Sequence, residues 1–290
     1  MSDTQYLAAK TIDEAVNAHE KANGTARFLA GGTDLLVQIK SGIRKPNLVI
    51  DIKKIVELNS INENSDGEFE IGASVSGANL NRNSKFAKLW PGVLEAFRLI
   101  GSEQIQGRAS LGGNLCNGSP AGDSVPALIA AGCKAVIAGP KGRKDVPIEN
   151  FHLGPGKTVL ENGEMLVSLK FPKRVSNSAD AYLRMTPRTE MDIAVVGCGV
   201  NISLENDICT HARVSLGAVA PTPLLIKEAS DIMIGSKLDD DTLDRVSKIC
   251  MDACNPINDK RGTVDYRTKV AGVLFKRATK LAAERIGGNK

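Results

Sequence analysis

The sequence predicts an α+β fold, with an α/β region over residues 1–177 and a smaller α+β domain over residues 178–290. Three observations indicate this class. Strand-like and helix-like segments alternate through the first half, glycine-rich turns separate several of them, and the last third reads as paired strands followed by two helices. A chain of 290 residues with 42% apolar residues can build one large domain or two moderate ones.

The first part of the α/β region, about residues 1–56, is predicted to be a small α/β unit. Thr11-Ile12-Asp13-Glu14 is a capping box, in which the Thr11 hydroxyl meets the Glu14 amide and the Glu14 side chain reaches back. A strand is expected at residues 28–30 and a second amphipathic helix at residues 35–39. Residues 47–52 read as a buried strand, so a glycine turn lies at a strand-to-helix junction.

Residues 57–177 are predicted to form a second subdomain, and residues 173–179 resemble a linker, which places the domain boundary near residue 177. The carboxy-terminal third is expected to contain two strands that pair across a short turn, and then two helices. The expected elements are a strand at 69–72, a helical region at 86–100 broken at Pro91, a polar glycine-rich loop at 107–124, a helix at 125–132, strands at 134–138, 192–204 and 212–219, and helices at 240–253 and 266–286.

Composition excludes several function classes. Aromatic residues make up only 4% and the net charge is +4 without a basic run, so a nucleic-acid surface is not expected, whereas an anionic small molecule or an acidic partner is. The first residues lack a secretory pattern, and no apolar stretch is long enough for a membrane span, so a cytoplasmic protein is expected. The six cysteines form no CxxC pair and are expected to be reduced thiols.

The first candidate binding element is the turn Ala30-Gly31-Gly32-Thr33-Asp34. Glycines at a strand-to-helix turn let the backbone approach a ligand, and the free amides at the start of the next helix favour an anion such as phosphate. The Thr33 hydroxyl adds a donor. The alternative is a plain tight turn in which Thr33 or Asp34 caps the helix.

The second candidate element is the segment from Ser110 to Ser124, which contains four glycines and precedes a helix. Long irregular segments in compact chains are more often functional than idle. Its amides and hydroxyls suit a pyrophosphate and a sugar-like chain, with Asp123 accepting hydrogen bonds from hydroxyl groups; the alternative is that Asp123 is a helix N-cap. Two such loops in one domain favour an extended phosphate-containing ligand.

Three other patterns do not predict a site. Neither loop reads GxGxxG, so a Rossmann nicotinamide site is not supported. Gly156-Lys157-Thr158 is similar to the end of a P-loop, but Phe151 occupies the place of its first glycine and the next residues read as a strand. The histidines, at positions 19, 152 and 211, have no paired spacing that points to zinc or to a catalytic triad.

These loops, in this order, resemble the FAD-binding (medium) subunit of the molybdenum hydroxylases, the family of carbon monoxide dehydrogenase and xanthine dehydrogenase. Each matching string is short, but together they span nearly the whole chain in a consistent order. They are Ala30-Gly31-Gly32-Thr33-Asp34, Ala109-Ser110-Leu111-Gly112-Gly113-Asn114, Ser119-Pro120-Ala121-Gly122-Asp123, Gly154-Pro155-Gly156-Lys157-Thr158, Gly163-Glu164-Met165-Leu166, Arg188-Thr189-Glu190-Met191-Asp192-Ile193-Ala194, Leu216-Gly217-Ala218-Val219-Ala220-Pro221-Thr222-Pro223 and Asp265-Tyr266-Arg267.

The resemblance implies an FAD-binding domain in two subdomains, with the flavin fold of vanillyl-alcohol oxidase and p-cresol methylhydroxylase, followed by a smaller α+β domain. It implies that FAD is the cofactor of this chain. A cation near the flavin ring would favour the reduced, anionic flavin, which is the role implied for Arg184; the alternative is a surface arginine on an interdomain loop. The residues implied to contact FAD are Ala30, Gly31, Gly32, Thr33, Asp34, Leu35, Ser110, Gly112, Gly113, Asn114, Cys116, Asp123, Leu166 and Arg184.

The resemblance also implies a division of labour between chains. Substrate hydroxylation belongs to a large molybdenum–pterin subunit, [2Fe-2S] clusters belong to a small subunit, and the FAD of this chain passes electrons to an external acceptor. The implied assembly is (αβγ)2, an oxidoreductase of six chains. The alternative is a free-standing flavin oxidase of the vanillyl-alcohol-oxidase type, although the segment after residue 177 is shorter than the substrate domain of such enzymes.

Overall fold

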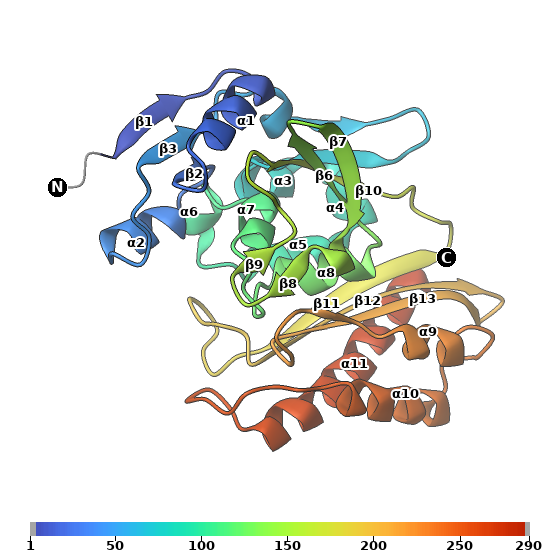
Figure 1. Ribbon diagram of the computed structural model, residues 1–290. Helices are drawn as coiled ribbons and strands as arrows, with labels where there is room; N and C mark the ends of the chain where they lie inside the picture. Colours follow the sequence, from blue (N-terminus) through green and yellow to red (C-terminus); the bar gives the residue numbers. More distant parts are fainter. Residues whose placement is uncertain (1–3, 288–290) are drawn as a thin grey trace.

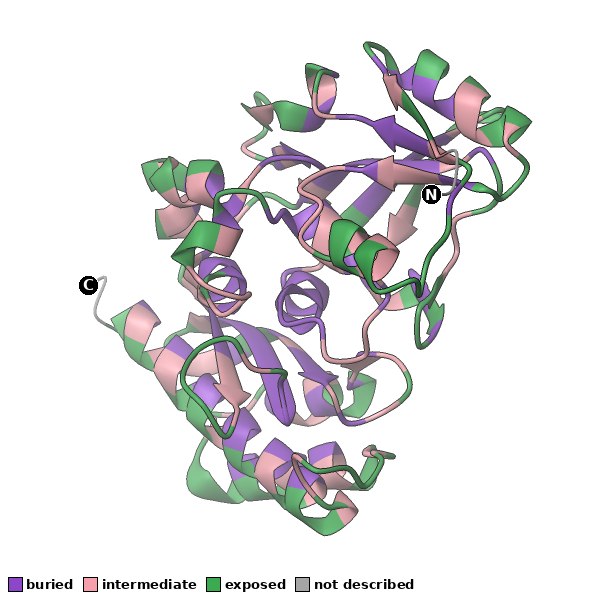
Figure 2. Ribbon diagram, turned by 90° about the vertical axis from the view of Figure 1, so that its left-hand side faces the viewer, coloured by how far each residue is buried: buried purple, intermediate pink, exposed green. Residues whose placement is uncertain are grey.

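The computed structural model describes residues 4–287. Its helices and strands form two halves that stack on each other, with the last helix packed beneath the sheet of the second half (Figure 1). Buried residues gather in the strands and in the helices that lie between the two halves, whereas the loops and outer helices are largely exposed (Figure 2). The predicted α+β class is confirmed.

The chain begins with a small α/β unit. Three parallel strands form a sheet in the order β1-β3-β2, and two helices connect them. These elements confirm the helices and strands predicted before residue 52. They are β1 (Gln5–Ala8), α1 (Ile12–Lys21), β2 (Ala26–Leu29), α2 (Leu35–Lys40) and β3 (Leu48–Asp51).

Helix α1 begins at the predicted capping box, with one difference. The Thr11 hydroxyl accepts a hydrogen bond from the Glu14 amide at 3.1 Å, as expected. The Glu14 carboxylate accepts from the amide of Lys10 at 2.8 Å, one residue before the position that the motif predicts. The hydroxyl still satisfies an otherwise unpaired amide of the first turn, so the cap fixes where the helix starts.

The next part contains a five-stranded antiparallel sheet in the order β4-β5-β10-β6-β7, with short helices packed against it. A separate hairpin, β8–β9, projects beside the sheet. The elements are η1 (Glu57–Asn59), β4 (Ile61–Glu63), β5 (Phe69–Gly72), α3 (Gly77–Arg82), α4 (Ser84–Leu89), α5 (Pro91–Arg98), α6 (Glu103–Gln106), α7 (Leu111–Cys116), α8 (Ser124–Ala130), β6 (Lys134–Gly139), β7 (Gly142–Pro147), η2 (Ile148–Asn150), β8 (His152–Gly154), β9 (Lys157–Thr158) and β10 (Met165–Phe171).

The expectation of one long irregular loop over residues 107–124 was wrong, because helix α7 lies within it. The Ser110 hydroxyl accepts a hydrogen bond from the Gly113 amide at 3.0 Å and so caps this helix. Two adjacent glycines lower the helix propensity of this segment, so the sequence did not predict helix α7. A Cβ at Gly112 would lie 2.5 Å from the carbonyl oxygen of Ala73, so close packing requires glycine there.

The second half is an antiparallel sheet in the order β11-β12-β13-β14, covered on one face by the last helices. Both predicted closing helices are confirmed. The elements are β11 (Ser178–Met185), β12 (Val196–Glu205), β13 (Ile208–Gly217), β14 (Leu224–Leu225), α9 (Lys227–Met233), α10 (Asp240–Asp252) and α11 (Val264–Gly287).

The strand predicted over residues 192–204 starts later, at Val196. Met191 has a φ of 54°, in the left-handed region, which breaks an extended backbone. Asp192 then accepts from the Ile193 amide at 2.8 Å and pairs with Arg188 at 3.6 Å. The segment before Val196 is therefore a loop.

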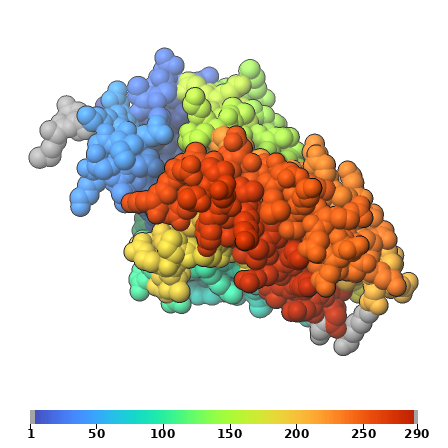
Figure 3. All heavy atoms as spheres, turned by 90° about the horizontal axis from the view of Figure 1, so that it is seen from below, coloured from blue at the N-terminus to red at the C-terminus, as the bar shows by residue number. Residues whose placement is uncertain are grey.

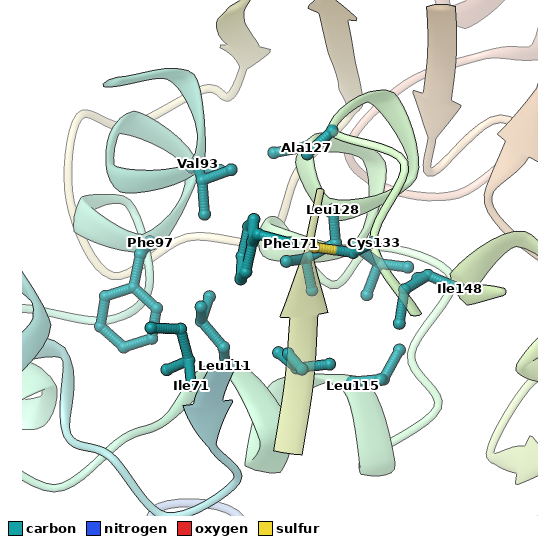
Figure 4. Close-up of a cluster of buried hydrophobic side chains, with 14 of the residues drawn as sticks. Ile71, Val93, Phe97, Leu111, Leu115, Ala127, Leu128, Cys133, Ile148 and Phe171 are labelled. Carbon is teal, nitrogen blue, oxygen red and sulfur yellow. The ribbon is translucent and has the colours of Figure 1, made fainter. Parts of the chain in front are cut away.

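Three hydrophobic cores hold these layers together. One lies under the amino-terminal sheet and extends to β6 and β10. A second fills the space between the five-stranded sheet and α5, α7 and α8, where the side chains of Phe97, Leu111, Leu115 and Phe171 point toward one another (Figure 4). The third draws its buried members from residues 179–286 and lies between the last sheet and the helices that cover it.

The two halves join along β11. The carboxylate of Asp180 on this strand accepts from the amide of Val93, in the first turn of α5, at 3.2 Å. A Cβ at Gly92 would lie 2.7 Å from the same carboxylate, so glycine allows α5 to approach this closely. Arg174 pairs with Asp180 at 3.2 Å and lies 4.3 Å from the ring centre of Trp90. It therefore contacts both halves of the molecule and helps to hold them together.

Candidate functional site

A cleft of about 680 Å³ lies between the amino-terminal unit, helix α7, the β8–β9 hairpin and the start of β10. Cavities of this size hold small-molecule ligands and cofactors. The structure brings most of the predicted binding residues together around it. Those that line the cleft are Ala30, Gly31, Gly32, Thr33, Asp34, Leu35, Ser110, Gly112, Gly113, Asn114, Cys116 and Leu166.

The first glycine turn lines this cleft and has unpaired backbone amides. Among residues 4–287, the amides of Thr33, Asp34 and Leu35 donate to no protein acceptor, although the turn continues into α2. The alternative in which a side chain caps α2 is not observed, since Asp34 occupies the cap position without a side-chain hydrogen bond. Burial raises the pKa of the Asp34 carboxyl. Successive free amides at such a turn suit a phosphate group.

The two glycine turns meet at one edge of the cleft. A Cβ at Gly31 would lie 2.0 Å from the carbonyl oxygen of Arg108, a distance that no pair of non-bonded atoms tolerates. The Arg108 guanidinium returns a hydrogen bond to the carbonyl of Gly31 at 3.3 Å. The two turns are therefore fixed to each other where Gly31 meets Arg108.

The second turn positions Asn114 at the cleft. Its side-chain oxygen accepts from the hydroxyl of Ser124 at 2.7 Å and from the Ser124 amide at 3.3 Å. These bonds fix the carboxamide from behind, because Ser124 is buried at the start of α8. With that oxygen occupied, the amide nitrogen of Asn114 remains available as a donor, and Asn114 lines the cleft.

Asp123 and Arg184 do not line the cleft but form a buried ion pair of 2.9 Å beside it. Tyr182 donates to the same carboxylate at 3.1 Å. The Arg184 guanidinium also donates to the carbonyl of Leu99 at 3.0 Å, and the next residue, Ile100, lines the cleft. The Asp123–Arg184 ion pair therefore supports the cleft wall at Leu99 and Ile100 without lining the cleft itself.

The structure does not support two alternatives that the sequence left open, namely Arg184 as a surface arginine and Asp123 as a helix N-cap. Only 2% of the Arg184 side chain is exposed, so this residue is not a surface arginine on a loop, and it lies on strand β11. Asp123 starts helix α8 without capping it through its side chain, because its carboxylate is turned toward β11 instead. A buried guanidinium is a stronger partner for a carboxylate than one helix amide.

The two buried aspartates of this region should make stability depend on pH. Burial raises the pKa of Asp123 to about 6 against the opposing effects of Arg184 and Tyr182, and burial also raises the pKa of Asp180 to about 6. The folded chain then binds these protons more tightly than the unfolded chain. Each carboxyl therefore contributes most to stability below about pH 4, and this contribution is lost between about pH 4 and pH 6 at no more than about 1.4 kcal/mol per pH unit.

Urea unfolding of the wild type and of Asp180→Asn, at pH values between about 4 and 7, measures the contribution of Asp180 to the pH dependence of stability. Carboxyls with lowered pKa, such as Asp239, contribute the opposite slope in both proteins, so the difference between the two curves is the quantity to measure. The difference should change across this window and flatten above it. Parallel curves would show that Asp180 is ionised throughout.

Sequence reasoning missed part of the cleft wall. The β8–β9 hairpin contributes Leu153, Gly156 and Lys157, and the amide of Gly156 donates to the carbonyl of Gly118 at 2.8 Å, which docks the hairpin onto the end of α7. The strand expected directly after this string, over residues 158–160, was placed wrongly, because β9 covers only Lys157–Thr158 and ends where that strand was expected to begin. The positive φ of 68° at Gly118 marks the turn that receives the hairpin.

The histidines also have structural roles that spacing did not reveal. His19 lines the cleft and stacks on Phe28, with ring centres 4.5 Å apart. His152 is buried, and its ring nitrogen contacts the carbonyl of Leu115 at 2.7 Å, so it supports α7. Within residues 4–287, no group of three histidine, cysteine or acidic side chains is arranged to hold a metal ion.

None of the helices in the described part of the chain is long and apolar enough to cross a membrane.

Comparison with known proteins gives concordant matches along the chain. The FAD binding domain in molybdopterin dehydrogenase matches residues 2–174, and the CO dehydrogenase flavoprotein C-terminal domain matches residues 181–282. The xanthine dehydrogenase FAD-binding subunit of Escherichia coli O157:H7 is 31% identical over 284 residues, covering 98% of this chain and 97% of that protein.

Two further similarities come from Hydrogenophaga pseudoflava. Its carbon monoxide dehydrogenase medium chain is 32% identical over 278 residues, which cover 96% of each chain. A solved structure of carbon monoxide dehydrogenase from this organism, which lacks the Mo-pyranopterin moiety of its cofactor, contains a chain that matches with a TM-score of 0.94. That match covers 97% of this chain and 98% of the other, at 32% identity.

Proposed function

The chain belongs to the FAD-binding medium subunits of the molybdenum hydroxylases, and from this premise we propose that its cleft holds FAD and relays electrons from the iron–sulfur clusters of a partner chain to an external acceptor. The observation that carries the proposal is the row of free amides at Thr33, Asp34 and Leu35, three residues that line a cleft of about 680 Å³ together with the second glycine turn. FAD supplies the redox chemistry, and the chain binds and orients it.

We propose that the first turn holds the pyrophosphate and that the second holds the sugar-like chain. Free amides support the first assignment, and the fixed carboxamide of Asn114 supports the second. Leu166 would contact the flavin, while Asp123 and Arg184 would support the cleft wall without lining the cleft. The proposed FAD-binding residues are Ala30, Gly31, Gly32, Thr33, Asp34, Leu35, Ser110, Gly112, Gly113, Asn114, Cys116, Asp123, Leu166 and Arg184.

We also propose that the FAD-binding domain ends near residue 177, with subdomains at about 1–56 and 57–177. The partition of buried side chains supports this boundary, because the third core draws its buried members from residues 179–286. The proposed partners are a large molybdenum-cofactor subunit and a small [2Fe-2S] subunit in an (αβγ)2 assembly in the cytoplasm.

Replacing Gly113 by valine tests the cleft directly. A Cβ at this position lies 3.1 Å from the capping hydroxyl of Ser110 and otherwise meets no neighbour within 4 Å, so the branched side chain extends along the cleft wall. We expect FAD affinity to fall at least about tenfold, as measured by flavin absorbance after gel filtration. Gly107→Val is the matched control, because Gly107 is exposed and does not line the cleft.

If the wild-type chain cannot be loaded with FAD, the proposed function is wrong. If Gly113→Val retains FAD as well as the wild type does, the second turn has only a structural role.

A further inference from the structure

The cleft is lined by two different apolar walls. Met165 and Leu166 follow each other at the start of β10 and both line the cleft, but they belong to different cores, because side chains alternate along a strand. Phe28 packs against the core that contains Met165, and Ile100 packs against the core that contains Leu166. We call His19, Phe28 and Met165 the His19 wall, and Ile100 and Leu166 the Leu166 wall.

The His19 wall contains a stacked aromatic pair. The ring centres of His19 and Phe28 lie 4.5 Å apart with an interplanar angle of 14°, and both residues line the cleft. Aromatic side chains are platforms on which the bases of nucleotides stack. The His19 wall can therefore receive a planar heterocycle.

His19 also offers a hydrogen-bond donor. Its Nδ1 accepts from the amide of Gly163 at 3.0 Å, and burial, together with the neighbouring Arg27, lowers the pKa of the imidazole. In the neutral ring the hydrogen is then on Nε2, and no acceptor among residues 4–287 receives it. The purine nitrogens and ribose oxygens of an adenosine group are acceptors for such a donor.

The Leu166 wall has a buried cation behind it. Arg184 donates to the carbonyl of Leu99, the residue before Ile100, at 3.0 Å. A guanidinium near the flavin ring favours the reduced, anionic flavin, so the flavin suits the Leu166 wall. The second ring system of FAD, the adenine, then remains for the His19 wall.

We infer that the His19 wall is the subsite for the adenosine half of FAD, with the adenine packed on the His19–Phe28 pair and an adenosine acceptor on Nε2 of His19. This inference deepens the proposed function and rests on it, because it takes the ligand to be FAD. It makes His19 and Phe28 determinants of the affinity for the dinucleotide.

The carboxy-terminal half does not contribute to this subsite. The residues that line the cleft all lie between positions 19 and 166. The amino-terminal unit, blue in Figure 3, lies at the edge of the molecule, clear of most of the orange and red carboxy-terminal helices. Substitutions in the His19 wall should therefore leave the joint along β11 intact.

The test measures the affinity of the flavin-free full chain for FAD and for ADP by titration calorimetry. ADP keeps the adenosine and pyrophosphate groups of FAD but lacks the flavin. Phe28→Leu removes the aromatic ring and keeps an apolar side chain, whereas His19→Ala removes both the ring and the donor. Each variant should weaken the binding of FAD and of ADP by a similar factor, at least about tenfold.

Ile100→Ala, in the Leu166 wall, should give the opposite pattern, with weaker FAD binding and unchanged ADP binding. Asn17→Ala is the matched control, because Asn17 is exposed on the same helix as His19 and does not line the cleft, so both affinities should be unchanged. Phe28→Tyr keeps the ring and should bind both ligands as the wild type does. If urea unfolding shows that Phe28→Leu is not folded, His19→Ala decides, because His19 is only half-buried.

Loss of FAD binding without loss of ADP binding in His19→Ala would place the flavin at the His19 wall and overturn the inference. Unchanged affinities for both ligands would overturn it as well. A wild-type chain that binds FAD but not ADP would also contradict it, because the adenosine half would then contribute no affinity. A wild-type chain that does not bind FAD overturns the proposed function itself.

Discussion

Replacing Gly31 by valine should abolish FAD binding, the largest functional effect expected for a single substitution in this chain. The new Cβ would lie 2.0 Å from the carbonyl oxygen of Arg108 and 2.6 Å from its carbonyl carbon. Both are backbone atoms, so no side-chain rotation can relieve the overlap, and the two glycine turns must separate. The free amides at Thr33, Asp34 and Leu35 then lose their position relative to the second turn.

The expected loss of FAD affinity is at least about a hundredfold, or about 2.7 kcal/mol. Titration of the flavin-free chain with FAD, followed by fluorescence quenching, measures it. The double variant Gly31→Val/Arg108→Ala is the control, because the clash is with the backbone and removing the Arg108 side chain should not restore binding. Restoration would show that the side chain, and not the backbone, limits the approach of the turns.

Replacing Asp123 by alanine should cause the largest loss of stability. The substitution removes the carboxylate from Arg184, whose side chain is 2% exposed, and leaves a buried guanidinium without a counter-charge. Tyr182 also loses its acceptor. Breaking one side of a buried ion pair typically costs about 3–5 kcal/mol, and the same change should loosen the contact of Arg184 with the cleft wall at Leu99.

Urea unfolding at about pH 8, where the Asp123 carboxyl is ionised, measures this effect. The double variant Asp123→Ala/Arg184→Met should be more stable than the sum of the two single variants predicts, because it removes both charges together. A loss below about 1 kcal/mol in Asp123→Ala would show that water or another group compensates Arg184.

Local patterns were sufficient for the elements whose signals lie within a few residues. The capping box at Thr11 predicted where α1 begins, and the apolar runs predicted β2 and β3. Pro91 marked the break between α4 and α5, because a proline cannot continue the preceding helix but suits the first position of the next. The glycine turn before α2 was recognised for the same reason, since its chemistry is local.

Elements that depend on packing were missed or placed wrongly. Helix α7 contains two glycines that disfavour a helix, and it forms because Gly112 packs against Ala73 and Ser110 caps its first turn. The place of the β8–β9 hairpin in the cleft wall depends on a hydrogen bond between Gly156 and Gly118 that no sequence period signals.

The sequence by itself determined the fold class and the two glycine turns, because turn chemistry and apolar periodicity depend on residues close together in the chain. The order of the short motifs along the chain also indicated the family. Only the tertiary structure decided that Asp123 and Arg184, 61 residues apart, form a buried ion pair beside the cleft. Burial and pairing are properties of distant segments brought together, and the free energy of a charge depends on that environment more than on its neighbours in the chain.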